Sequence, residues 1–166
     1  VLLIAAIVAV GVRGVRVAGS FRRPALGVAE DNFPVRAARF VTQNEIQGNV
    51  FNTMELGGYL IWSWYPERKV FIDGRLDVYG HELFDLYAKT LRSEADLDAV
   101  VAKYDIGCFL LSQPARDATV TPYYLGRTLS RRPDWSLVFW DDRALVYVRD
   151  TPPHRRLIEA QAYHAV

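Results

Sequence analysis

The fold of this chain is decided by a short apolar run and the turn that ends it, Val70-Phe71-Ile72-Asp73-Gly74-Arg75. The run is rich in β-branched and aromatic residues, which favour strands. Gly74 permits a sharp turn out of a strand. Polar groups at the end of a strand lie where α/β sheets place their ligands. We therefore predict a strand over residues 69–72, followed by a candidate binding edge.

Other apolar runs on either side of this stretch predict the rest of a sheet. Residues 49–52 predict a short strand, and residues 106–111 are apolar without interruption, which indicates a strand covered on both faces. Two β-rich runs, 135–140 and 144–149, are separated by three polar residues and predict a hairpin.

Helical spacing and capping residues alternate with these strands. We expect helices after Pro34, over residues 53–65 and 81–91, after Ser93, after Pro122 and, briefly, after Pro152. The order of elements predicts an α/β fold with a mixed sheet, helices on its faces and a C-terminal β-hairpin.

The first twelve residues are uncharged and apolar on every side. A membrane span needs roughly 20 such residues, so we interpret this stretch as the end of a truncated transmembrane helix. The chain starts with Val1 and its only methionine is Met54, which agrees with truncation. A signal peptide and a buried helix are the alternatives. Four arginines follow, and by the positive-inside rule they would place the next domain in the cytoplasm: Arg13, Arg16, Arg22 and Arg23.

Composition limits the classes of function. Twenty basic residues face nineteen acidic ones, and no basic run interleaves with aromatics, so nucleic acid is not an expected partner. Cys108 lies in an apolar run and is expected to be a buried, inert thiol. The three histidines lack metal-ligand spacing, so no metal site is expected.

We expect four segments: 1–18, a membrane helix end with its basic flank; 19–33, a linker; 34–150, a soluble α/β domain; and 151–166, a C-terminal helix or tail.

The candidate binding edge contains two carboxylates, a guanidinium and a phenol: Asp73, Arg75, Asp77 and Tyr79. Arg75 could bind a phosphate or carboxylate through two parallel hydrogen bonds. Asp73 or Asp77 could accept hydrogen bonds from sugar hydroxyls, hold a metal or act as a base. The alternative is structural: Asp73 caps the turn and pairs with Arg75.

The helix expected over residues 53–65 contains two unusual features. Asn52 can cap it, but the adjacent Gly57 and Gly58 together cost about 2 kcal/mol of helix propensity. Close approach by another backbone or by a ligand would account for them. The helix also carries four aromatic residues, which could stack on sugars, lie at a membrane interface or pack in the core: Tyr59, Trp62, Trp64 and Tyr65.

Read together, three stretches resemble a known family. They are Gly48-Asn49-Val50-Phe51-Asn52, Gly57-Gly58-Tyr59-Leu60-Ile61-Trp62 and the segment from Tyr65 to Tyr79. Their order, across residues 34–149, resembles the C-terminal soluble domain of bacterial polytopic membrane proteins that are similar to GT-C-type glycosyltransferases. The resemblance implies a lipid-linked sugar donor and transfer on the extracytoplasmic face. This location disagrees with the cytoplasmic location that the four arginines predict. It also implies catalytic acids in loops between upstream membrane helices, outside this chain, and no cofactor in this part.

The family's motif positions fall on nine residues, to which the resemblance assigns no catalytic role: Asn52, Gly57, Gly58, Tyr59, Trp62, Asp73, Gly74, Arg75 and Asp77. Three hypotheses follow. In the first, the chain is an accessory domain of a membrane glycosyltransferase-like protein that binds a glycan acceptor or the donor's pyrophosphate. In the second, it is a structural or interaction module that packs on its own upstream transmembrane region and has no ligand. In the third, it is a stand-alone soluble enzyme tethered by one helix, which requires a deep pocket containing Asp73 and Asp77.

Overall fold

A computed structural model of the chain describes residues 15–17, 20–22, 32–113 and 122–163. The chain divides into two units near residue 30, which are described separately. In the first unit, β1 (Val15–Val17) pairs antiparallel with β2 (Ser20–Arg22), a ribbon that sequence reasoning did not predict. The expected membrane helix of residues 1–12 lies outside the described residues. Within the described ranges, no helix combines the length and the apolar character needed to cross a membrane.

The second unit is built on a four-stranded mixed sheet. Its strands are β3 (Asn49–Asn52), β4 (Ile106–Ser112), β5 (Trp135–Trp140) and β6 (Ala144–Arg149), in the spatial order β3-β4-β6-β5. The β3–β4 pair is parallel, and the other two pairs are antiparallel. All seven residues of β4 are buried, which confirms the predicted central strand. The β5–β6 pair confirms the predicted hairpin.

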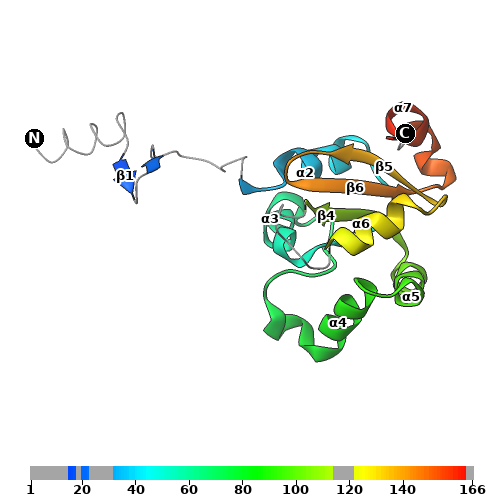
Figure 1. Ribbon diagram of the computed structural model, residues 1–166, viewed down its shortest axis with the longest axis horizontal. Helices are drawn as coiled ribbons and strands as arrows, with labels where there is room; N and C mark the ends of the chain where they lie inside the picture. The colour runs from blue at the N-terminus through cyan, green and yellow to red at the C-terminus, as the bar shows by residue number, and fades with distance from the viewer. Residues whose placement is uncertain (1–14, 18–19, 23–31, 114–121, 164–166) are drawn as a thin grey trace, which may run out of the picture. The chain divides into compact units, whose positions relative to one another are not determined.

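Helices cover both faces of this sheet (Figure 1). One face packs against α2 (Val35–Gln43), α3 (Met54–Trp64) and α7 (Arg155–Gln161). The other face packs against α4 (Leu76–Thr90), α5 (Glu94–Tyr104) and α6 (Pro122–Ser130). Successive strand residues point to opposite faces, so Leu110 joins the first cluster and Phe109 the second. The predicted α/β architecture with a mixed sheet is confirmed.

Local chemistry explains where α5 begins and why α4 is interrupted. The Ser93 side chain accepts a hydrogen bond from the N–H of Asp96 at 3.2 Å, so the predicted cap of α5 is confirmed. Helix α4 starts five residues before the predicted position and is interrupted at Gly80, whose φ of 71° is unfavourable for residues with a side chain. Gly80 therefore joins a short helical turn to the predicted helix that follows it.

The strand predicted over residues 69–72 is wrong. This segment is not part of the sheet, and β3 is an edge strand. Its apolar side chains nevertheless pack in the core. Val70 packs with the apolar cluster on the α2–α3–α7 face of the sheet, and Phe71 and Ile72 pack with the cluster on the opposite face. The segment therefore supplies apolar side chains to both clusters without the alternation and the backbone pairing of a strand.

The C-terminal segment continues directly from the sheet. A short 3₁₀ helix, η2 (Pro152–His154), leads into α7, as the two prolines predicted. The buried His154 ring accepts a hydrogen bond from the N–H of Gln47 through Nε2, at 3.0 Å, and Nδ1 lies 2.9 Å from the Arg149 carbonyl. Nδ1 therefore carries the proton and donates to that carbonyl. This ring joins the end of β6 to the loop before β3.

Candidate functional site

The Asn52 side chain ties the segment after α3 to the end of β3. Its Oδ1 accepts a hydrogen bond from the N–H of Phe71 at 2.8 Å, and its Nδ2 donates to the carbonyl of Ile72 at 2.7 Å. The residue is fully buried. The predicted capping role is wrong, because Thr53 occupies the N-cap of α3 and Asn52 is engaged with residues 71 and 72. These two side-chain hydrogen bonds take the place of the backbone hydrogen bonds that a fifth strand would have made with β3.

Gly57 lies where the same segment crosses α3. A Cβ atom at this position would overlap the carbonyl oxygen of Ile72 and would lie 2.7 Å from Cα of Asp73. The close backbone approach predicted for the glycine pair is therefore confirmed at Gly57. Gly58 faces open space, so it has no such constraint and its conformational cost is unexplained by packing.

Asp73 and Arg75 form an ion pair at the turn. Arg75 donates from its backbone N–H to Oδ1 of Asp73 at 2.8 Å, and from Nε and Nη2 to Oδ2 at 2.9 and 2.6 Å. The Asp73 side chain is 3% exposed, whereas that of Arg75 is 62% exposed. Both carboxylate oxygens are thus engaged, in the arrangement that the structural alternative predicted. We call Asn52, Gly57, Asp73 and Arg75 the clasp.

The ion pair determines the charge state of the turn. Hydrogen bonds from Arg75 lower the pKa of the Asp73 carboxyl, although burial opposes this effect. Burial, with the negative charge of Asp73, raises the pKa of the Tyr79 phenol. At neutral pH, Asp73 is therefore an anion paired with a cation, and Tyr79 is a neutral phenol whose hydroxyl interacts with that pair.

The remaining predicted site residues do not form one site. Asp77 is exposed on the first turn of α4. The Tyr59 ring is half-buried and lies between Phe33, at a centroid distance of 5.4 Å, and Trp62, at 5.6 Å. Trp62 is 67% exposed, and Tyr65, at the end of α3, is 78% exposed. Only Trp64 of the four aromatic residues is fully in the core, where its indole N–H donates to Ala38.

A pocket adjoins the clasp through Tyr79. Its volume is about 210 Å³, and we call it the phenol pocket. Its lining residues are Ile61, Tyr65, Arg68, Lys69, Val70 and Tyr79. Two phenols and an ammonium group thus share one cavity with aliphatic side chains. Such a combination offers a stacking surface, hydrogen-bond donors and a positive charge.

The two cations of this pocket differ in availability. Arg68 donates to the carbonyls of Gly48 and Ile46, and its guanidinium lies 5.9 Å from the centre of the Trp64 ring. Lys69 is exposed and makes no salt bridge with any residue that the structure describes. Lys69 is therefore the cation that can meet a ligand.

Sequence reasoning missed Lys69 as a site residue and did not assign Tyr65 to the site. The signal that could have found Lys69 was a cation immediately before the apolar run. Only Tyr79 among the predicted binding residues lines the phenol pocket, while the clasp residues hold the segment that forms its wall. No protein-family model, curated protein or solved structure matches this chain.

Proposed function

We propose that this chain is the accessory C-terminal domain of a membrane glycosyltransferase-like protein, and that the phenol pocket binds the sugar-phosphate part of a lipid-linked sugar. The observation that carries the proposal is the combination of exposed Tyr65, exposed Lys69 and the neutral Tyr79 phenol in one cavity. Aromatic rings stack on the apolar faces of sugars, and an ammonium group is a good phosphate ligand. The resemblance supplies the class of protein.

The clasp supports this function indirectly. Asp73 and Arg75 satisfy each other, so neither is free to receive a ligand without breaking the pair. Their role is to hold the turn that leads from Val70 to Tyr79, two residues of the pocket wall. In this proposal the clasp residues position the pocket and make no contact with the sugar phosphate.

The domain contributes binding and no chemistry of its own. The partners in this proposal are the upstream transmembrane region of the same protein, the membrane and the lipid-linked donor or glycan acceptor. Transfer takes place on the extracytoplasmic face, as the resemblance implies, and the catalytic acids belong to the membrane region.

The test is a titration of the 166-residue chain with a hexose 1-phosphate, followed by NMR. The expected result is saturable binding with shifts at Tyr65, Lys69 and Tyr79. Tyr65→Ala should weaken binding about fivefold, because stacking contributes roughly 1 kcal/mol. Lys69→Gln should weaken it by a similar factor, since an exposed ion pair contributes up to about 1 kcal/mol.

Two exposed residues elsewhere serve as matched controls. Tyr163→Ala and Lys89→Gln remove the same chemical groups outside the pocket and should leave affinity unchanged. Binding that fails to saturate, or that responds equally to the site and control variants, would overturn the proposal.

The second candidate function is a ligand-free interaction module, and the saturated ion pair of the clasp favours it. In that case the exposed rings of Phe33, Trp62 and Tyr65 form the contact surface for the upstream membrane region. Cross-linking from position 62 to that region in the full-length protein, with no response to hexose 1-phosphate, would support this candidate over the first.

A further inference from the structure

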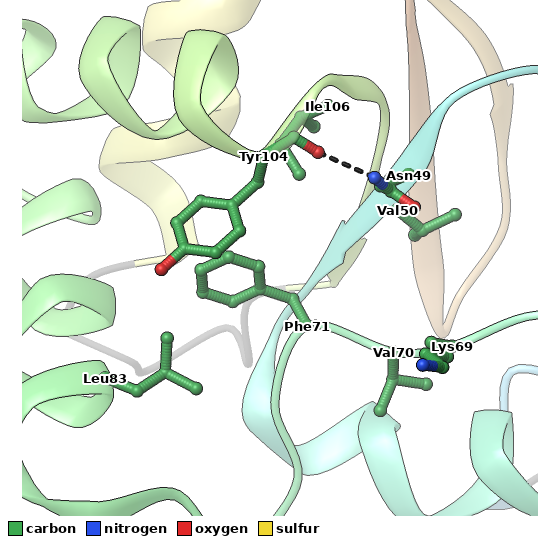
Figure 2. Close-up of a pocket in the computed structure, with 8 residues that line it drawn as sticks. All are labelled: Asn49, Val50, Lys69, Val70, Phe71, Leu83, Tyr104 and Ile106. Carbon is green, nitrogen blue, oxygen red and sulfur yellow. Dashed lines mark hydrogen bonds between the residues drawn. The ribbon is translucent and has the colours of Figure 1, made fainter.

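A second pocket lies beside the free edge of β3. Its volume is about 240 Å³, and we call it the edge pocket. Its lining residues are Asn49, Val50, Lys69, Val70, Phe71, Leu83, Tyr104 and Ile106. Figure 2 shows the rings of Phe71 and Tyr104 adjacent to each other; their centroids are 5.3 Å apart in an edge-to-face arrangement. In this view Leu83 and Tyr104 lie at one end of the lining and Lys69 at the other.

The pocket exists because residues 69–71 run beside β3 without pairing with it. Strands of a sheet lie about 4.8 Å apart, which leaves no space between their backbones. Here the Asn52 side chain bridges the two segments near Phe71 and Ile72. Toward Asn49 and Val50 no described hydrogen bond joins the two segments, and the pocket opens there.

The charge of the pocket lining is confined to Lys69, while the side chains of Asn49 and Tyr104 are neutral polar groups. The backbone N–H groups of Lys69 and Val70 donate to no residue within the described ranges. The amide of Asn49 is already engaged, because its Nδ2 donates to the Tyr104 carbonyl at 2.7 Å. The lining therefore combines one ammonium group with five apolar side chains, those of Val50, Val70, Phe71, Leu83 and Ile106.

We infer that the edge pocket binds the hydrocarbon end of an amphipathic anion whose phosphate or carboxylate lies at Lys69. A lining with one cation and five apolar side chains fits a ligand with an apolar body and one anionic end. At roughly 30 Å³ for a water-sized group, the pocket volume of about 240 Å³ holds about eight heavy atoms, which is a hydrocarbon chain of about eight carbons beyond the carboxyl or phosphate group.

The position of Lys69 links this pocket to the phenol pocket. Both cavities include Lys69 and Val70 in their walls. Lys69 is therefore shared by a pocket with two phenols and a pocket in which five of the eight lining side chains are apolar, an arrangement that corresponds to the order sugar, phosphate, lipid. In this sense the inference rests on the proposed function, since it assigns the first carbons of the lipid to the edge pocket.

The test is a titration of the 166-residue chain with straight-chain carboxylates of four to fourteen carbons, below micelle-forming concentrations. Each buried methylene contributes about 0.8 kcal/mol, so affinity should rise about fourfold per added carbon. The rise should stop near eight to ten carbons, when the pocket is full. A rise that continues to fourteen carbons, or no rise at all, would overturn the inference.

Variants distinguish binding in the edge pocket from nonspecific binding to exposed apolar surface. Leu83→Trp, at a half-buried position, should abolish the chain-length dependence by filling the pocket. Lys69→Gln should weaken decanoate severalfold and leave decanol unchanged, while Lys89→Gln should change neither. Decanoate binding that is indifferent to both Leu83→Trp and Lys69→Gln would overturn the assignment.

A comparison of geranyl phosphate with decanoate identifies the source of the ligand. Tighter binding of geranyl phosphate indicates an isoprenoid lipid carrier, and tighter binding of decanoate indicates a fatty acid; either result supports the pocket. Carboxylates contain no sugar, and hexose 1-phosphate contains no hydrocarbon chain. Failure of one titration is therefore distinguishable from failure of the other.

Discussion

Replacing Asp73 by asparagine should destabilise the second unit while leaving its shape intact. The substitution keeps one acceptor oxygen for the N–H of Arg75. It places an amide NH₂ group where Oδ2 now accepts from Nε and Nη2 of Arg75, so donors face donors. Because the Asp73 side chain is 3% exposed, water cannot easily resolve this conflict.

The structure bounds the magnitude of this effect. Hydrogen bonds to charged groups contribute about 1.5–3 kcal/mol. The lower end applies, because the Arg75 side chain is 62% exposed and water can solvate its freed donors. A loss of about 1.5 kcal/mol corresponds to a drop in melting temperature of roughly 5–7 °C for a domain of this size.

The assay is thermal unfolding of the 166-residue chain, followed by circular dichroism at pH 7. Asp77→Asn is the matched control, because Asp77 is exposed and makes no salt bridge within the described ranges; its effect should stay within about 0.5 kcal/mol. Equal melting temperatures for the two variants would refute the structural role of the ion pair.

The same difference should depend on pH in one direction. The folded-state pKa of Asp73 lies below the ordinary value of 3.8, so its stabilisation is present above that value and is lost as the pH falls through the folded pKa. The melting difference between the wild type and Asp73→Asn should therefore be constant from about pH 7 to 5 and should shrink below pH 4. A difference below pH 4 that is as large as the difference at pH 7 would contradict this prediction.

Three further predictions concern glycine packing, the buried thiol and the C-terminal segment. Gly57→Ala should destabilise by at least about 2 kcal/mol because the new Cβ would overlap Ile72, whereas Gly58→Ala should stabilise by about 0.5–1 kcal/mol; chemical denaturation measures both. Burial raises the pKa of Cys108 to about 12, so an aromatic disulfide reagent at pH 8 should react only after unfolding, and rapid reaction of the native chain would contradict this. His154→Ala should cost about 2–3 kcal/mol by leaving the Gln47 N–H without its acceptor, and hydrogen exchange at that amide should accelerate.

Where sequence reasoning succeeded, local and tertiary preferences agreed. Residues 106–111 were apolar without interruption and became the central strand. Ser93 had both the residue type and the spacing of a cap, and it accepts the expected hydrogen bond. The apolar surroundings of Cys108 predicted its burial correctly.

Where sequence reasoning failed, a side chain had replaced a backbone interaction. The run 69–72 has the composition of a strand, but its partner groups are the amide atoms of Asn52, nineteen and twenty residues away in sequence. No periodicity reveals that an asparagine will bind a distant backbone. The same run also contributes residues to the linings of two pockets, and this position follows only from the place of β3 at the edge of the sheet.

Only part of the candidate site was predicted from the sequence. The turn at Asp73 was correctly located, and its structural alternative matches the geometry, because a two-residue spacing places an arginine within reach of an aspartate. Lys69 was missed because its place before the apolar run does not by itself show that its ammonium group has no carboxylate partner among the described residues. Gly80 was missed as a helix interruption because single glycines are also tolerated inside helices.

The most direct test of the whole account is a titration with a single molecule that combines its parts, a hexose joined through phosphate to a ten-carbon isoprenoid chain. We expect NMR shifts at Tyr65, Lys69 and Leu83 that saturate together, with tighter binding than either hexose 1-phosphate or geranyl phosphate shows. Shifts confined to other surfaces, or an affinity no better than that of the separate parts, would contradict the proposal that the two pockets form one site.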